Sequence, residues 1–251
     1  MPKTIIDIKD LSFIFDDGYM GLNHISLSIN QGEFILVAGK NGSGKTTFLR
    51  HLNGLLKPTS GTIKVNGKEV SKHLVETRRT VGMVFQDPDT QMVGDTVFDE
   101  VAFGPENLRL NRALINEKTT KVLEALDLFH LKDRNPSTLS GGEKRKVAIA
   151  GILVMDPEVI VFDEPFSNLD YPGTLQVLAT IMDLYRAGQT VMIATHDIEP
   201  VIFEATRMII MEKGSIREDG LPLDLVGRLE SCGVREPCFS KFRLEPQSWL
   251  K

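Results

Sequence analysis

A glycine-rich loop carries the clearest chemical signal in this sequence. Residues 39–46 match the pattern GxxxxGK[ST] at every fixed position, and Thr47 follows them. Glycines let backbone N–H groups turn inward around phosphate oxygens, and the N-terminus of a following helix adds positive potential. We therefore expect Lys45 to reach the β- and γ-phosphates of a nucleoside triphosphate and Thr46 to ligate Mg²⁺.

An acidic pair further along the chain supplies what this loop lacks. Asp163 and Glu164 directly follow the apolar residues 159–162. Mg²⁺ held by one hydroxyl and by phosphates needs a carboxylate as well, and ligands of open α/β folds bind at the carboxyl ends of strands. We expect Asp163 on the metal side and Glu164 as the group that polarises a water for attack on the γ-phosphate. A helix cap before Pro165 is the structural alternative.

Three further features accompany the loop and the acidic pair. Gln86 and His196 each close a predicted strand, and residues 139–143 open a predicted helix. A lone Gln or His is usually a surface or packing residue. Ser-Gly-Gly at a helix start, however, is a second anion-binding geometry. Because one nucleotide does not need two such cradles, we infer that the second grips a phosphate held by another copy.

Alternating strands and helices must position these residues. Such alternation indicates a largely parallel sheet covered on both faces, and the apolar run at 34–38 is typical of a strand buried on both faces. Asn66-Gly67 predicts a tight hairpin turn. The expected strands are at 25–29, 34–38, 62–65, 81–85, 159–162, 190–195 and, last, 207–211. The expected helices are at 46–55, within 96–136, and at 140–155, 173–187 and 198–205, with a short helix and a tail after 220.

Length and composition exclude several classes of protein. The chain has 251 residues, 41% hydrophobic and 25% charged, which is typical of a globular protein and not of a disordered chain or coiled coil. Its net charge of -5 does not favour binding to nucleic acid or to an anionic membrane. The most apolar segment, 147–155, is far shorter than the roughly 20 residues that span a bilayer. No signal peptide is predicted, so any membrane role must come through a partner.

Cysteine and histidine give no sign of a further metal site. Cys232 and Cys238 fit neither a CxxC metal motif nor a disulfide framework, which predicts free thiols in a reducing cytoplasm. The five histidines are scattered without metal-ligand spacing.

Taken in order, the motifs resemble those of the ATP-binding cassette (ABC) ATPases over about residues 4–215. Residues 39–46 resemble the Walker A motif, 139–143 the signature, 160–163 Walker B and 167–170 the D-loop. The resemblance implies an α/β fold, the P-loop NTPase ABC-type nucleotide-binding domain with an antiparallel β subdomain and a helical subdomain. It implies an ABC ATPase domain at 1–220, its helical subdomain at about 96–156, and a short C-terminal extension at 221–251.

The resemblance also implies roles for single residues, with ATP and Mg²⁺ as cofactors. Glu164, His196 and Gln86 are implied as catalytic, and Thr46, Gln86 and Asp163 as Mg²⁺ contacts. The signature is implied to contact ATP bound by the other subunit of a head-to-tail dimer that sandwiches two ATP molecules. Its residues are Ser140, Gly141, Gly142 and Glu143, and Asp170 belongs to the D-loop. The implied nucleotide contacts are Gly39, Lys40, Asn41, Gly42, Ser43, Gly44, Lys45, Thr46, Thr47 and Phe15.

Three stretches resemble one subgroup in particular, the energy-coupling-factor and cobalt-type importers. They are residues 85–91, 96–107 and 147–151. The resemblance implies an ATP-hydrolysing subunit, peripheral on the cytoplasmic face of the cell membrane, that powers uptake of a micronutrient, either a cobalt or nickel ion or a vitamin. It implies a homodimer or a heterodimer with a related ABC ATPase, bound to membrane-embedded transporter subunits and not to nucleic acid.

The sequence departs from the family pattern at several places. Glu143 replaces the usual Gln, a conservative change, and Phe15 replaces a Tyr that stacks on adenine, for which any ring suffices, with Tyr19 as the second choice. Phe166 and Asn168 replace smaller residues near the D-loop, and the C-terminal extension is short.

Three alternative functions stay open at this point. The first is the ATPase of another class of ABC transporter. The second is a soluble ABC ATPase that acts on nucleic acid or ribosomes, whose chains tend to carry two cassettes or a coiled-coil insertion that this chain lacks. The third is a small-molecule kinase, which would need neither residues 140–142 nor His196.

Overall fold

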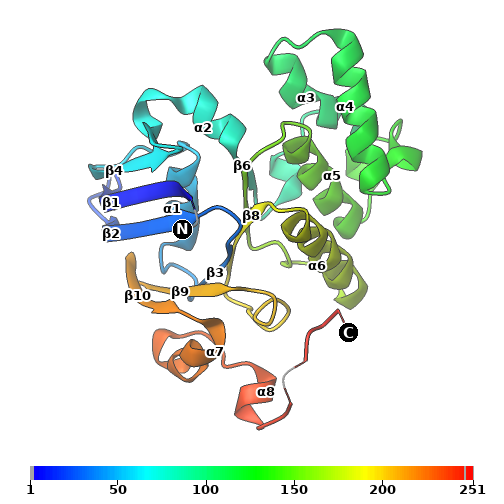
Figure 1. The fold of residues 1–251 in the computed structure, drawn as a ribbon. Helices are drawn as coiled ribbons and strands as arrows, with labels where there is room; N and C mark the ends of the chain where they lie inside the picture. Colours follow the sequence, from blue (N-terminus) through cyan, green and yellow to red (C-terminus); the bar gives the residue numbers. More distant parts are fainter. Residues whose placement is uncertain (1–2, 246, 251) are drawn as a thin grey trace.

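The computed structural model describes residues 3–245 and 247–250, which form two β-sheets with helices around them (Figure 1). The strands are β1 (Thr4–Ile14), β2 (Met20–Asn30), β3 (Phe34–Ala38), β4 (Ser60–Val65), β5 (Lys68–Glu69), β6 (Val81–Val84), β7 (Val159–Asp163), β8 (Thr190–Thr195), β9 (Arg207–Glu212) and β10 (Ser215–Gly220). The α-helices are α1 (Lys45–Leu52), α2 (Leu74–Thr80), α3 (Val97–Asn107), α4 (Arg112–Ala125), α5 (Gly141–Leu153), α6 (Tyr171–Arg186), α7 (Pro222–Leu225) and α8 (Cys238–Lys241).

The larger sheet has the strand order β10-β9-β3-β8-β7-β6. All of its neighbouring strands pair in parallel except β10, which is antiparallel to β9. Strands β3, β7 and β8 are buried along their whole length, as their continuous apolar runs predict. Their carboxyl ends therefore meet at one edge, where Asp163 pairs with Ala194 and Ala38 pairs with Thr195.

The smaller sheet is antiparallel, with the order β2-β1-β4-β5. Its β4–β5 hairpin turns at Asn66 and Gly67, whose φ angles of 48° and 77° are both positive. Two positive φ angles are what a tight turn between right-twisted strands requires. The hairpin predicted from Asn66-Gly67 is confirmed.

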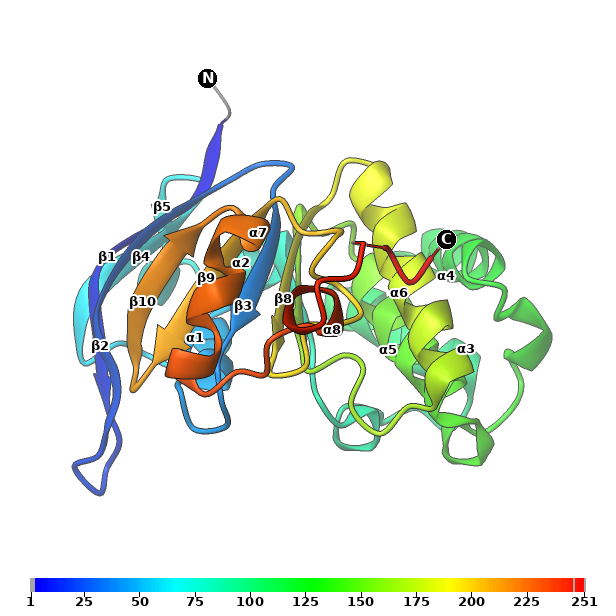
Figure 2. The same ribbon diagram turned by 90° about the horizontal axis from the view of Figure 1, so that it is seen from below.

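Figure 2 shows the layers of the fold, which three hydrophobic cores of the described residues hold together. One lies between the larger sheet, α1 and the smaller sheet, and includes Ile35, Val37 and Phe48. A second covers the opposite face of the larger sheet with α6 and part of α5. The third joins α3, α4 and the other side of α5 around nine buried side chains. The larger sheet is thus covered on both faces, as predicted.

The prediction of a helix at 198–205 is wrong. Ile198, Val201 and Ile202 are buried at a spacing that imitates a helix, but the segment forms a series of turns. Pro200 has no N–H to donate, and only the N–H of Ile202 reaches a carbonyl four residues back.

Strand β1, strand β10 and helix α2 were not among the elements expected from the sequence. Strand β1 precedes the first expected strand, and β10 follows β9, so residues 207–211 are not the last strand. Strand β10 and helix α2 are short, and neither shows a clear period of buried residues.

The ranges 1–220 and 221–251 stay a prediction as domain boundaries, and residues 1–2, 246 and 251 lie outside the described part of the chain. Within the extension, Leu225, Val226, Leu229 and Val234 are buried in the core on the α6 side of the larger sheet. The first part of the extension therefore packs as part of the main body.

Candidate functional site

The glycine-rich loop connects the end of β3 to α1. Gly44 caps the helix with a φ of 103°, and Gly42 has a φ of 78°, both of which glycine adopts without strain. A Cβ on Gly39 would lie 2.4 Å from Ser43 Oγ and 2.7 Å from the Met211 carbonyl oxygen. The Ser43 hydroxyl is buried and has no hydrogen-bond partner among the described residues. The loop is therefore closely packed against the end of β9. The Ser43 hydroxyl and the N-terminus of α1 are left to bind an anion.

Lys45, the first residue of α1, is buried in this loop. Its Nζ donates to the Gly39 carbonyl oxygen at 2.6 Å and lies 3.5 Å from Glu164 Oε1. Burial lowers the pKa of Lys45, an effect that the Glu164 carboxylate partly offsets. The ammonium group thus sits between the loop and the acidic pair, where it could bind a phosphate oxygen.

Asp163 ends β7 and is buried. Its Oδ1 accepts a hydrogen bond of 2.9 Å from the hydroxyl of Thr46 in α1. Burial raises the pKa of Asp163, although the hydrogen bond from Thr46 acts in the opposite direction. A hydroxyl and a carboxylate in contact are hard oxygen donors of the kind that Mg²⁺ prefers.

Among the described residues no group of three or more His, Cys, Asp or Glu side chains could hold a metal ion. A Mg²⁺ at Thr46 and Asp163 would therefore complete its ligands with phosphate oxygens and water, which is its usual behaviour in nucleotide sites.

Glu164 is held from three sides. Its φ is 48°, which is uncommon for a residue with a side chain. Thr195 Oγ1 donates to Oε2 at 2.8 Å, while the backbone N–H and the Nδ1 of His196 contact Oε1 at 3.0 and 2.9 Å. The Glu164 side chain is 9% exposed and the His196 side chain 50% exposed, so the imidazole links the buried carboxylate to the surface. The structure thus brings Glu164, His196 and Lys45 together.

Thr195 is a site residue that the sequence reasoning missed. It is the last residue of β8, directly before His196, and it is buried and donates to the Glu164 carboxylate. The position of Thr195 in the sequence could have revealed it, because the end of a strand that pairs with β3 and β7 must lie at the edge of the sheet that carries the site.

Gln86 and Phe15 lie at the margins of the site. Gln86 is exposed just after β6. The ring of Phe15 lies 6.2 Å from that of Tyr19. A Cβ on Gly21 would lie 2.6 Å from Phe15 Cε2, and one on Gly44 would lie 3.0 Å from the Gly21 carbonyl oxygen. Phe15 and the phosphate loop are therefore separated only by Gly21, a position from which a ring could stack on a base.

The signature residues form the start of α5. Ser140 caps the helix, and its N–H and hydroxyl donate to Glu143 Oε2 at 2.8 and 2.7 Å. These hydrogen bonds lower the pKa of Glu143. A Cβ on Gly141 would lie 3.3 Å from a methyl of Leu169, in the D-loop. Within the described chain, no hydrogen bond or ion pair joins Ser140–Glu143 to residues 39–47.

The D-loop leads directly into α6. Asp170 caps this helix by accepting a 2.9 Å hydrogen bond from the Gly173 N–H. Asn168 has a φ of 60°, and Phe166 is buried in the core on the α6 side. The two departures from the family pattern therefore have local reasons, a left-handed turn that Asn tolerates and a core position that an aromatic ring fills.

A protein-family model described as "ABC transporter" matches residues 22–167, more than half of the chain. The chain therefore belongs to the ABC transporter family, whose ATPase domain binds ATP.

The most similar relatives narrow this class. The energy-coupling factor transporter ATP-binding protein EcfA of Methanocaldococcus jannaschii is 40% identical over 230 residues, which cover 90% of this chain and 82% of the relative. The protein of the same name from Carboxydothermus hydrogenoformans is 37% identical over 239 residues, covering 94% and 88%. The chain is thus an ABC-type ATPase of the energy-coupling-factor group, as the sequence motifs predicted.

A solved structure supports the same assignment. It is that of cbiO1 from Clostridium perfringens, described as part of the ABC transporter complex cbiONQ. It matches with a TM-score of 0.82 and 33% identity, and the match covers 96% of this chain and 99% of the other. The predicted ABC-type fold is confirmed. Over residues 3–245 and 247–250, none of the helices has the length and apolar character needed to cross a bilayer.

Proposed function

We propose that this ATPase powers an importer for a micronutrient, a cobalt or nickel ion or a vitamin, as a peripheral subunit on the cytoplasmic face of the cell membrane. The relatives of the energy-coupling-factor group and cbiO1 support this reading. The observation that carries ATP hydrolysis, the activity that would power import, is the site itself, in which Glu164 lies beside Lys45 at the end of a phosphate loop. The domain ranges 1–220 and 221–251 and the helical subdomain at about 96–156 are part of the proposal.

Within one chain, the catalytic step follows from the position of Glu164. Thr195 and His196 orient its carboxylate, so that it can accept a proton from a water that attacks the γ-phosphate. Lys45 and the loop N–H groups would bind the phosphate oxygens and so stabilise the charge that develops on them. Gln86 and His196 would contact the attacking water and the γ-phosphate, and Phe15 would stack on the base.

Thr46 and Asp163 would hold Mg²⁺, with Gln86 reaching it from the end of β6. The ion would neutralise charge on the phosphate oxygens. In this chain the Thr46 hydroxyl and the Asp163 carboxylate already face each other at 2.9 Å, so little rearrangement is needed.

The second half of each site comes from another subunit. Ser140, Gly141, Gly142 and Glu143 form no hydrogen bond or ion pair with the phosphate loop of their own chain within the described residues, although they form a helix start of the kind that binds anions. We therefore propose a head-to-tail dimer in which they contact ATP held by the partner's loop, with Asp170 near the shared interface. The partner is a second copy or a related ABC ATPase.

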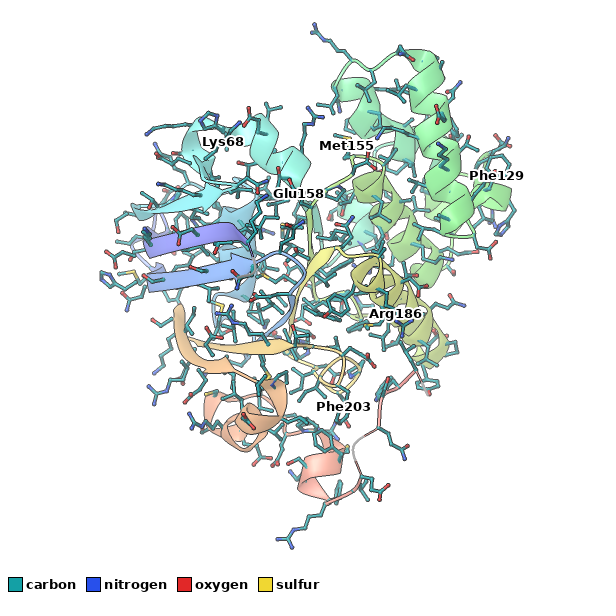
Figure 3. All side chains as sticks on the ribbon, viewed as in Figure 1. Lys68, Phe129, Met155, Glu158, Arg186 and Phe203 are labelled. Atoms are coloured by element: carbon teal, nitrogen blue, oxygen red, sulfur yellow. The ribbon has the colours of Figure 1, made fainter. Side chains whose placement is uncertain are left out.

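The membrane partner would dock on the segment 87–100. Four of its carboxylates are exposed, those of Asp87, Asp89, Asp95 and Asp99. Helix α3 begins in this segment and ends at a cleft of about 540 Å³ beside α2, near Met155 and Glu158 (Figure 3). We propose that a basic, helical segment of a membrane-embedded subunit follows α3 from the acidic surface to this cleft.

Replacing Glu164 with Gln tests two parts of the proposal, that Glu164 is the proton acceptor and that two subunits share each ATP site. The variant should bind ATP and form a stable dimer, while phosphate release falls by at least about 10²-fold because the proton acceptor is gone. Sedimentation velocity with and without ATP measures the dimer, and steady-state phosphate release measures turnover. Glu117→Gln, on the exposed face of α4, is the matched control and should behave as the wild type.

Two results would contradict the proposal. Turnover at the wild-type rate in Glu164→Gln would assign the proton acceptor to another group. A chain that stays monomeric with ATP at every concentration would contradict a pocket shared between two copies of this chain.

A further inference from the structure

Arg145 is an unusual feature of the segment after the signature. It lies in the second turn of α5, two residues after Glu143, and is 2% exposed. It forms no ion pair within the described part of the chain, and the opposing charges that act on it, Asp87 and Asp163, are not in hydrogen-bond contact with it. Burying a guanidinium without a contacting carboxylate costs free energy of folding. We therefore expect the contacts that Arg145 does make to serve a role.

The guanidinium bridges two backbone carbonyls from distant parts of the sequence. Nη1 donates to the Phe85 carbonyl oxygen at 2.7 Å, and Nη2 lies 3.5 Å from the Ser167 carbonyl oxygen. The third nitrogen, Nε, is buried and has no hydrogen-bond partner among the described residues. One side chain therefore connects α5 to the end of β6 and to the turn after β7.

Both carbonyls belong to segments that carry proposed site residues. Phe85 directly precedes Gln86, and its N–H donates to Gln91 Oε1 at 3.2 Å. Ser167 closes a turn on Glu164, because its N–H and hydroxyl donate to the Glu164 carbonyl oxygen at 3.2 and 2.9 Å. Arg145 thus contacts the backbone of two segments that carry proposed site residues.

A neighbouring ion pair strengthens one of the two connections. Lys144 Nζ lies 2.6 Å from Asp89 Oδ1, and the Lys144 side chain is only 16% exposed. Helix α5 starts in the capping box of Ser140 and Glu143, so the signature, Lys144 and Arg145 occupy two consecutive helical turns. A displacement of the signature would therefore move the anchors of the Gln86 and Glu164 segments with it.

We propose that Arg145 is a positioning residue that couples the signature to the hydrolysis site of its own chain. The inference rests on the proposed function, in which the signature binds ATP held by the partner subunit. Engagement of that ATP would then set the positions of Gln86 and Glu164 in this chain, so each subunit would become competent for hydrolysis only when its signature is occupied. Such coupling needs an element with connected contacts to both sites, and α5 supplies it.

Arg145→Met tests the bridge, because methionine removes the donors but keeps much of the volume. Arg186→Met, on the exposed end of α6, is the matched control (Figure 3). We expect kcat for ATP hydrolysis to fall at least tenfold in Arg145→Met, while the Kd for ATP at dilutions that keep the chain monomeric changes less than twofold. Hydrogen exchange without ATP should become at least tenfold faster in residues 85–91 and 164–169, and Arg186→Met should match the wild type in all three.

Arg145→Lys keeps the proposal falsifiable if the methionine variant does not fold. Lysine keeps the buried charge but presents one compact ammonium in place of a fork, so it cannot span both carbonyls in the same way. We expect the wild-type Tm with kcat still lowered at least threefold. A lysine variant with wild-type kcat, or a methionine variant with wild-type kcat and exchange, would overturn the bridge.

Failure of the proposed function would look different. In that case the Glu164→Gln chain would show no ATP-dependent dimer with Arg145 intact. That result would overturn the coupling between subunits, while the exchange rates would still decide whether Arg145 holds both segments.

Discussion

At the scale of the residue, the candidate site holds several charged side chains in a region that is largely excluded from solvent. Lys45, Asp163 and Glu164 are all buried, and burial shifts the pKa of Lys45 downward and that of Asp163 upward. Both shifts mean that the charged forms are less stable in the folded chain than in the unfolded one. The nucleotide-free protein therefore gives up stability at the position where we propose that Mg²⁺ binds.

Asp163→Asn should reveal this cost. The amide can still accept the hydrogen bond from Thr46 but carries no charge, so the nucleotide-free variant should unfold at a Tm higher by roughly 2–4 °C, the shift that about 1 kcal/mol gives in a chain of this size. ATP hydrolysis should be lost at the same time. Calorimetry without nucleotide and phosphate release measure the two effects.

The pH dependence fixes the sign of this effect. A carboxyl whose folded pKa is raised contributes stability at low pH, and that contribution is lost as pH rises through the folded pKa. The Tm difference between Asp163→Asn and the wild type should therefore grow as the pH rises above the ordinary pKa of 3.8. The difference should level off once the pH exceeds the raised pKa of the folded state, so a difference that stays constant from below pH 3.8 upward would show that burial of the charge is not its cause.

The residues found from the sequence and those missed differ in how they carry their signal. The phosphate loop and the Asp163–Glu164 pair could be predicted because the residues that make up each motif are adjacent in the sequence. Thr195 and Arg145 could not, because their partners lie 31 residues away at Glu164 and 60 residues away at Phe85. Only the pairing of parallel strands and the packing of α5 bring these groups together.

At the scale of the element, α5 begins with a conflict between helix capping and the proposed binding of phosphate. Ser140 donates both its N–H and its hydroxyl to Glu143, which stabilises the helix start. A phosphate of ATP bound by the other subunit would compete with Glu143 for the Ser140 hydroxyl. The Glu143 carboxylate would also repel this phosphate. The usual Gln at this position would cap the helix without the repulsion.

Glu143→Gln should therefore strengthen the ATP-dependent dimer. Because the carboxylate is partly exposed, we expect about 0.5–1 kcal/mol, a two- to fivefold lower dissociation constant, measured by sedimentation in the Glu164→Gln background. Glu117→Gln in the same background is the control. A dimer that is unchanged or weaker would place the Glu143 charge away from the triphosphate.

Helices and strands could be predicted where the pattern of apolar residues in the sequence matches the burial pattern of the element that forms. Strands β3, β7 and β8 are buried on both faces and read as continuous apolar runs. The segment 198–205 shows the limit, since its buried Ile198, Val201 and Ile202 have helical spacing although Pro200 and the short length prevent a helix. Periodicity reports which residues are buried, and the backbone can bury them in more than one way.

At the scale of the whole molecule, the acidic surface on 87–100 is the feature that points outward. Among its exposed carboxylates only Asp89 has a cationic partner, Lys144, in the described structure. Asp95 and Asp99 lie at the start of α3, where acidic residues also favour the helix dipole. A surface with this charge can select a basic partner and direct its approach.

Reversing two of these charges tests the docking surface. Asp95→Lys combined with Asp99→Lys should reduce recovery of the membrane subunits in detergent at least tenfold, because two attractions become repulsions. ATP-dependent dimerisation of the chain alone should persist. Asp183→Lys with Glu117→Lys, both on exposed helix faces, is the control for net charge. Full recovery of the complex by the test variant would exclude this surface.

Helix α5 also belongs to two cores at once. Ala148 and Ile149 pack toward the larger sheet, while Val147, Ala150 and Val154, the residue that follows the helix, pack toward α3 and α4. The bundle around α3 and α4 therefore cannot separate from the sheet by melting a loop, because one face of its own helix would have to leave the other core. A rotation of the bundle about α5 would keep both faces of this helix covered, so we expect rotation rather than local unfolding if the bundle moves in the proposed dimer.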